Sequence, residues 1–212
     1  MERRLAEPAP DTAEYVVWNA RCSRAGGQNR CVPVDTIVTR SCREFSDALK
    51  QGLSGQTTVD RDAIAAVGVR CAAIRAIGTA RAAKASAVRT FRLTRRALGE
   101  LPATLALAVT DQDSVQLWAA GSRGVSLLGE TGRASATVEH YASGDTALRV
   151  AARDQNLTFE ILARGDFDGD GWDDLLVHAV AGARGGSFTT DEVYVLTRRD
   201  PGRVLRVVRR VW

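Results

Sequence analysis

Five aspartates lie close together near the C-terminal end of the chain, in the segment GDFDGDGWDDLLV, residues 165–177, and four of them are spaced as ligands of one ion would be. Asp166, Asp168 and Asp170 occupy alternate positions, and Asp174 follows four residues after Asp170. Alternate residues of a tight loop can turn their carboxylates toward one point. A hard cation such as Ca²⁺ needs roughly six to eight oxygen ligands, which such a loop supplies. The spacing therefore predicts a cation site with these four aspartates as side-chain ligands.

The backbone of the same segment also fits a calcium loop. Gly171 permits the sharp turn that brings the next carbonyl group, that of Trp172, toward the ion. An EF-hand would close with a bidentate glutamate at the twelfth position, but Val177 stands there and an apolar, strand-like run surrounds it. The segment is therefore not an EF-hand, and the remaining oxygens must come from the backbone or from water.

The segment resembles the calcium loop of FG-GAP/VCBS-type repeats, D-x-D-G-D-G-x-x-D-L, which connects two strands, often in β-propellers of cell-surface proteins. The resemblance implies Ca²⁺ as the bound ion and implies ligands from the positions that match the motif. These are the side chains of Asp166, Asp168, Asp170 and Asp174 and the carbonyl group of Trp172. A propeller needs several copies of its blade, whereas this chain holds one good copy of the loop, which argues against a full propeller.

Other interpretations of the acidic segment are a magnesium site, a solvated turn and a catalytic carboxylate cluster. Unpaired carboxylates this close repel one another, which favours a bound cation over a bare turn. Magnesium prefers few protein ligands and keeps several waters. Aspartates that converge on one point suit an ion better than a substrate held between two groups. The acidic segment therefore predicts a calcium site.

No catalytic residue is predicted. The chain lacks G-x-S-x-G, H-E-x-x-H, P-loop and G-x-G-x-x-G motifs. Its two histidines, His140 and His178, stand alone in strand-like segments, where a structural role is more common than general-base catalysis. An enzyme is thus less expected than a binding protein.

The four cysteines, Cys22, Cys31, Cys42 and Cys71, lack the paired spacing of a zinc site and suggest two disulfides. Three pairings are possible. A Cys22–Cys31 bridge would close a glycine-rich loop, leaving Cys42–Cys71 to join two helices; free buried thiols are the alternative. Disulfides imply the periplasm, the cell surface or the exterior. A signal or lipoprotein leader would then have been removed, and residues 1–13 would form a flexible tether.

Composition narrows the partners. All but two of the 29 basic residues are arginine, which is typical of a GC-rich coding sequence and indicates a bacterial source. The net charge of +4 is modest and its arginines are dispersed, so nucleic-acid binding is not expected. No apolar run is long enough for a transmembrane segment.

Hydrophobic periodicity predicts an α+β fold: a mostly helical, cysteine-containing half followed by an antiparallel β-sheet with the calcium loop between two strands. Residues 14–100 would hold strands at 14–20 and 34–39, a helix capped by Ser41 with Glu44, and an amphipathic helix from about Thr58 to Val88. Residues 101–212 would form the sheet, either as a separate domain or in one domain with residues 14–100. The sheet would begin with a hairpin of residues 114–121 and 124–130, and six further strand-like segments follow.

These features predict an exported calcium-binding protein with a structural Ca²⁺ site and a protein or glycan partner at the cell envelope. One alternative is a secreted hydrolase or carbohydrate-active protein that calcium supports, for which His140, His178 or Glu160 would line a pocket. The other alternative is an inhibitor or immunity-type protein that uses its arginine-rich helix as the contact surface.

Overall fold

The computed structural model describes residues 15–25, 28–55, 58–131, 137–141, 146–152, 154–186 and 188–212. Within these residues the protein belongs to the α+β class, as predicted. The chain forms two compact units, Met1–Ile74 and Arg75–Trp212. The predicted tether, residues 1–13, lies outside the described residues.

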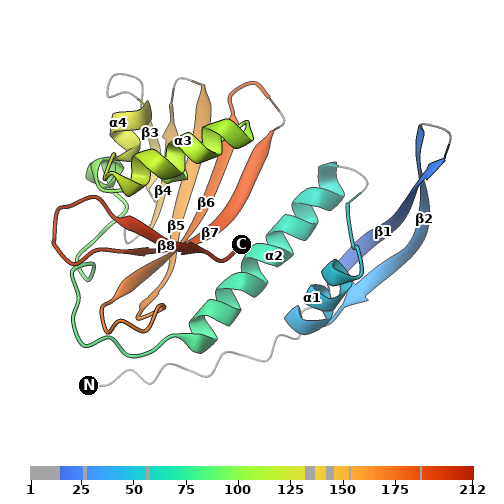
Figure 1. Cartoon of the computed structure of the whole chain (residues 1–212), viewed down its shortest axis with the longest axis horizontal. Helices are drawn as coiled ribbons and strands as arrows, with labels where there is room; N and C mark the ends of the chain where they lie inside the picture. The colour runs from blue at the N-terminus through green and yellow to red at the C-terminus, as the bar shows by residue number, and fades with distance from the viewer. Residues whose placement is uncertain are drawn as a thin grey trace. The chain divides into compact units, whose positions relative to one another are not determined.

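The first unit begins with an antiparallel hairpin of β1 (Tyr15–Ala25) and β2 (Gln28–Thr39) (Figure 1). Both predicted strands exist, but each is longer than expected. The ladder extends into the segment that the sequence predicts to be a glycine-rich loop, as far as the pair of Ala25 and Gln28, and it sets Cys22 opposite Cys31. The Cys22–Cys31 bridge itself stays a prediction.

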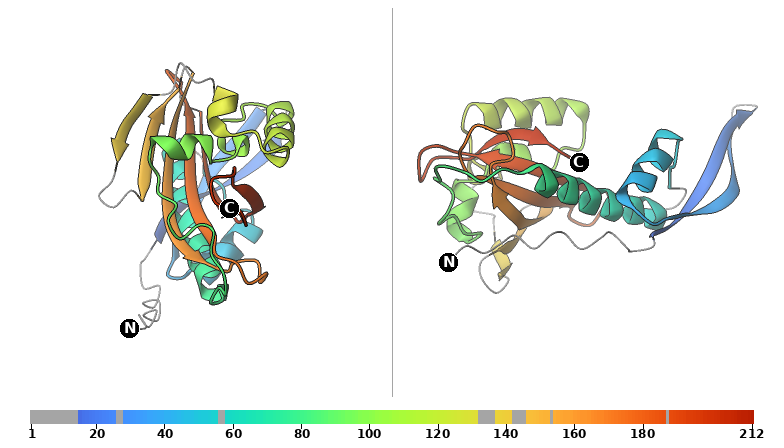
Figure 2. Two further views of the ribbon diagram at one scale, coloured as in Figure 1. Left: turned by 90° about the vertical axis from the view of Figure 1, so that its left-hand side faces the viewer. Right: turned by 90° about the horizontal axis from the view of Figure 1, so that it is seen from below.

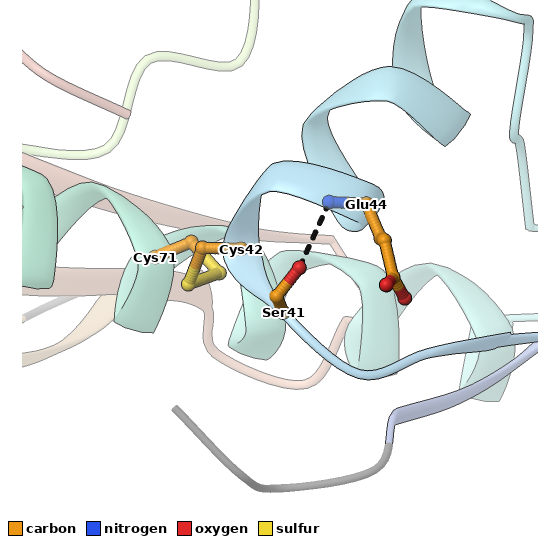
Figure 3. Close-up of a disulfide and its surroundings, with 4 residues drawn as sticks. All are labelled: Ser41, Cys42, Glu44 and Cys71. Atoms are coloured by element: carbon orange, nitrogen blue, oxygen red, sulfur yellow. Dashed lines mark hydrogen bonds between the residues drawn. A yellow bond between two sulfur atoms is a disulfide. The ribbon is translucent and has the colours of Figure 1, made fainter. Parts of the chain in front are cut away.

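Helix α1 (Cys42–Lys50) begins at the predicted cap. The Ser41 hydroxyl accepts a hydrogen bond from the Glu44 amide at 3.2 Å. The Glu44 carboxylate accepts one from the Arg40 amide at 2.7 Å, one residue ahead of the cap residue. Figure 3 shows this cap beside the Sγ atoms of Cys42 and Cys71, which lie at disulfide distance, 2.14 Å apart. This pairing, favoured by the sequence, ties α1 to α2 (Thr58–Thr79).

Helix α2 keeps only part of its predicted apolar stripe and length. Val67 and Cys71 are buried, whereas Ile77 is exposed. The helix ends at Thr79, so the predicted continuation to about Val88 is wrong. No helix in the described part of the chain has the length and apolar character needed to cross a membrane.

The second unit contains a six-stranded antiparallel sheet in which each strand pairs with the next along the chain. All six strand-like segments predicted after residue 131 are confirmed. The strands are β3 (Thr137–Tyr141), β4 (Ala147–Ala151), β5 (Gln155–Gly165), β6 (Asp174–Ala183), β7 (Thr189–Thr197) and β8 (Arg206–Arg210).

The predicted hairpin of residues 114–130 is wrong, because this stretch is helical. Helix α3 (Asp111–Ser122) begins with a capping box, in which Thr110 and Asp113 bond each other's amides. Helix α4 (Leu127–Thr131) follows α3. Two short 3₁₀ turns, Arg95–Gly99 and Ala103–Leu105, precede α3. Both α-helices lie on one face of the sheet (Figure 2).

The helices and the sheet of this unit share one apolar core. Phe159 of β5, Val177 of β6 and Leu196 of β7 are fully buried, and Leu117 of α3 and Leu127 of α4 belong to the same cluster. Alternate strand residues point into this core. The packed central strands provide a rigid base for the loop that joins β5 to β6.

Candidate metal centre

The aspartate loop, residues 166–173, joins two adjacent antiparallel strands. Gly165, the last residue of β5, pairs with Asp174, the first residue of β6. The loop therefore leaves and re-enters the sheet at neighbouring positions, and the carboxylate of Asp174 lies at its closing end. This is the predicted placement of the loop between two strands.

Three of the predicted ligands converge. One carboxylate oxygen each from Asp166, Asp168 and Asp174 lies within 4.8 Å of the others. Asp166 and Asp174 are buried, at 3% and 0% exposure, and Asp168 is exposed. The cluster is thus closed on the protein side and open toward solvent at Asp168, an arrangement that can surround a cation with oxygen from one side.

The loop folds around its own carboxylates. Asp166 accepts hydrogen bonds from the amides of Gly169 at 2.6 Å and Gly171 at 3.0 Å, one on each oxygen. Both glycines have positive φ, +86° and +87°, a conformation that strongly favours glycine. Asp168 accepts the amide of Asp170 at 3.0 Å. The glycines therefore allow the loop to turn its amides inward and hold the carboxylates in place.

Asp170 does not join the three converging carboxylates. Its Oδ1 accepts the amide of Trp172 at 2.8 Å, and its Oδ2 accepts a hydrogen bond from the guanidinium of Arg199 at 3.1 Å. The Trp172 amide, followed by Arg199, lowers the pKa of Asp170. The predicted ligand roles of Asp170 and of the Trp172 carbonyl remain predictions.

Asp174, at the closing end of the loop, has a carboxylate that hydrogen bonds satisfy only in part. Its Oδ2 accepts the Phe167 amide at 3.0 Å, but its buried Oδ1 has no hydrogen-bond partner in the described structure. The Thr197 hydroxyl lies near enough to lower the pKa in part, without a well-formed hydrogen bond. Burial dominates, and with the negative charges of Asp168 and Asp170 it raises the pKa to about 6.

Residues 81–85, which are remote in sequence, form backbone hydrogen bonds with the aspartate loop. The backbones of Arg81 and Asp166 exchange two hydrogen bonds, at 2.9 and 3.1 Å. The amide of Lys84 donates to the Gly171 carbonyl at 2.8 Å, and the Asp173 amide donates to the Ala85 carbonyl at 2.8 Å. We call residues 81–85 the bracing segment. These bonds explain why α2 stops at Thr79, since a helical backbone could not make them.

Sequence reasoning missed both the bracing segment and Arg199. The alanine-rich bracing segment has high helix propensity and no motif, so its pairing with the loop is visible only in three dimensions. Arg199 is the second residue after β7, and because β7 pairs with β6 its position beside the loop follows from the sheet order. The position of Arg199 could have been predicted only from the pairing of β6 with β7.

The two histidines proposed for a catalytic pocket do not extend this site. His178 of β6 bonds Asp191 at 2.6 Å and has Glu160 at 4.0 Å. Among the described residues no hydroxyl or thiol is hydrogen-bonded to His178. The side chain of His140 lies outside the described part of the structure. The geometry around His178 is that of a charged surface cluster on the sheet.

The strongest local chemistry of the described structure is therefore a cluster of aspartates around a buried, partly unsatisfied carboxylate. Comparisons of the chain with protein-family models, with curated proteins and with solved structures found no match. Function is accordingly inferred from the chemistry of the aspartate loop and its surroundings.

Proposed function

We propose that the aspartate loop binds one Ca²⁺ ion and that the protein is an exported calcium-binding protein with an interaction role at the cell envelope. The observation that carries this proposal is the Oδ1 atom of Asp174. It is a buried carboxylate oxygen without a hydrogen-bond partner, within a group of three carboxylates whose oxygens lie within 4.8 Å.

A cation accounts for this arrangement. Buried carboxylates cost free energy unless they are paired, and neighbouring negative charges add to the cost. Among the described residues no arginine or lysine forms an ion pair with Asp166, Asp168 or Asp174. A divalent cation at the point of convergence would neutralise the group and give the Asp174 Oδ1 atom a partner.

Calcium fits the ligand set better than other cations. All the converging groups are oxygens, which hard cations prefer, and the loop carries no histidine or cysteine. Magnesium requires strict octahedral geometry, whereas calcium tolerates irregular loops and more ligands. Asp170 and the Trp172 carbonyl would complete the protein ligands, as the resemblance to FG-GAP/VCBS-type loops implies, and water would supply the rest.

Calcium in this position has a structural role. It would link the ends of β5 and β6 and hold the loop against the bracing segment, and its binding free energy would add to the stability of the second unit. The Cys42–Cys71 pair supports the export part of the proposal, because disulfides persist in oxidising compartments. The partner, a protein or a glycan, is identified by neither observation.

Calcium titration and thermal unfolding of the full chain test the proposal. We expect saturable binding of one calcium ion per chain and a midpoint that rises with calcium and rises much less with magnesium. Asp166→Asn should abolish the calcium-dependent part of the shift. Asp173→Asn is the matched control, because Asp173 lies in the same loop outside the alternating ligand positions. Equal midpoints with and without calcium would rule out a structural ion.

A further inference from the structure

The aspartate loop borders a second feature that its calcium chemistry does not use. A cleft of about 510 Å³ lies between the loop and the segment that joins β7 to β8, and it includes Asp168 and Asp170 on one side. Arg199, Arg203 and Arg206 line the other side. The volume is that of a small-molecule site, but the lining is charged, which suits a small hydrophilic ligand.

The charges of this cleft are almost balanced internally. Arg199 pairs with Asp170 at 3.1 Å, and Arg203 pairs with Asp200 at 3.4 Å. Arg206, which is exposed, has no carboxylate partner in the described part of the chain. In this arrangement the guanidinium of Arg206 and the carboxylate of Asp168 both lie in the cleft without an ion-pair partner among the described residues, so the cleft has little net attraction for an anion.

Calcium would change that balance. Asp170 stands at the fifth position of the loop, a ligand position of the motif, yet its carboxylate is bonded to Arg199 instead of converging with Asp166, Asp168 and Asp174. A carboxylate that turns to the ion must give up this guanidinium. Arg199 and Arg206 would then both face the cleft without a carboxylate partner.

The ion itself would be reachable from the cleft. Val177 leaves the loop without the closing glutamate, so the protein supplies fewer oxygens than calcium takes. Asp168 is an exposed carboxylate of the cluster and also lines the cleft. An oxygen of a ligand in the cleft could therefore complete the coordination of the ion while guanidinium groups bind the rest of the anion.

We propose that this cleft binds a small oxyanion ligand, a carboxylate or a phosphate ester. Calcium would enable this binding by drawing Asp170 away from Arg199, which leaves the guanidinium able to bind the anion. The inference rests on the proposed calcium site and adds a ligand class to it. By linkage, the anion strengthens calcium binding by the same factor by which calcium strengthens anion binding.

The test is a binding titration of the full chain with three hexose probes of similar size: glucuronate, glucose 6-phosphate and glucose. Metal is removed on a chelating resin, because soluble chelators are themselves polyanions. We expect glucuronate or glucose 6-phosphate to bind the calcium-loaded protein and not the metal-free protein, with affinity that falls as salt rises. Glucose, which lacks the charge, should bind neither form. The two anionic probes distinguish a carboxylate from a phosphate ligand.

Two variants separate the cleft from the switch. Arg206→Gln should weaken probe binding about fivefold, the scale of one exposed charge pair, and leave calcium binding of the probe-free protein unchanged. Arg149→Gln, an exposed arginine of β4 outside the cleft, is the matched control. Asp170→Asn removes the carboxylate that holds Arg199, so this variant should bind the anionic probe without calcium.

The outcomes distinguish this inference from the proposal on which it rests. Calcium binding without binding of either anionic probe overturns the inference and leaves the calcium site standing. Equal probe affinity with and without calcium, or with and without the Arg206 charge, also overturns it. Failure of the chain to bind calcium overturns both, and direct calcium titration identifies that case.

Discussion

The Phe167 amide donates a hydrogen bond to the Asp174 carboxylate at 3.0 Å, so the first turn of the aspartate loop is tied to the first residue of β6. The other oxygen of that carboxylate is buried and has no partner in the described structure. The charge of Asp174 should therefore lower the stability of the metal-free protein and raise the stability of the calcium-bound protein.

Replacing Asp174 with Asn separates these effects. The amide oxygen can still accept from Phe167, while the buried negative charge is lost. Without metal at neutral pH, Asp174→Asn should therefore be more stable than the wild type, by about 2 kcal/mol. With calcium the order should reverse, because the variant loses a ligand. Denaturant unfolding with and without calcium measures both. If the variant is less stable than the wild type in the metal-free form, the charge of Asp174 does not destabilise the folded protein.

The pKa of Asp174 gives the metal-free protein a defined pH dependence. This pKa is about 6 in the folded protein and about 3.9 in an unfolded chain. The folded state therefore binds the proton more tightly, and the contribution is fully present below about pH 4 and lost as pH rises through about 6. The unfolding midpoint of the metal-free protein should fall across this range. Asp174→Asn should lack this component, and an identical pH profile in the variant would contradict the assignment.

Bound calcium should reverse this dependence, because the ion would bind the ionised carboxylate. Calcium affinity should weaken as pH falls below about 6, the folded pKa of Asp174. Titrations at a series of pH values check this, with Asp173→Asn as the control that keeps the wild-type profile. Affinity that stays constant from pH 7 to about pH 5 would exclude a ligand role for Asp174.

Gly171 should be difficult to replace because of its backbone conformation and not for lack of space. Its φ is +87°, and an added Cβ atom would come no closer than 3.8 Å to the Lys84 side chain. Gly171→Ala should thus cost about 1 kcal/mol of stability and weaken calcium binding. Gly99→Ala, at a position with ordinary φ and open space around it, should cost much less. Equal effects of the two substitutions in denaturant unfolding would argue against strain at Gly171.

The pair of Cys42 and Cys71 should stabilise the first unit. The two residues are 29 positions apart, and a bridge that closes a loop of that length lowers the conformational entropy of the unfolded chain, which stabilises the folded state by about 3.6 kcal/mol. The double variant Cys42→Ser/Cys71→Ser should lose about that much in denaturant unfolding, without a change in calcium affinity. Because the variant removes only this pair, Cys22 and Cys31 remain as in the wild type. An unchanged unfolding midpoint would show that the bridge contributes little.

The strands of the second unit could be predicted because short apolar runs are separated by turn-forming residues. Buried residues alternate in part of β5, at Leu157 and Phe159, and form a continuous run in β7, residues 193–196. Residues 114–130 were assigned incorrectly because the short apolar run around Leu117 fits either period. The capping box of Thr110 and Asp113 was the overlooked signal for a helix. Residues 80–88 were assigned incorrectly for another reason: backbone hydrogen bonds to the aspartate loop outweigh the helix propensity of the alanines.

The candidate site was predictable to the extent that it is local. The spacing within one loop placed Asp166 and Asp168 with Asp174, and it identified Gly171 as a turn residue; the positive φ of Gly169 was not predicted. The ion pair of Asp170 depends on Arg199, which lies 29 residues further along the chain and comes near only through the pairing of β6 with β7. Contacts of this kind depend on the tertiary fold and carry no signature in the spacing of residues.

The bracing segment has a consequence for protease resistance. Arg81 and Lys84 are exposed and are both cleavage sites for trypsin, yet their backbone amides are bonded to the aspartate loop. A protease needs an extended, detached backbone, so it can cut there only when the hydrogen bonds between the bracing segment and the aspartate loop are broken. Calcium that rigidifies the loop would therefore protect a site in the chain about eighty residues away in sequence from the ion. In the proposed exported state, the calcium concentration around the protein would then determine how long the chain stays intact.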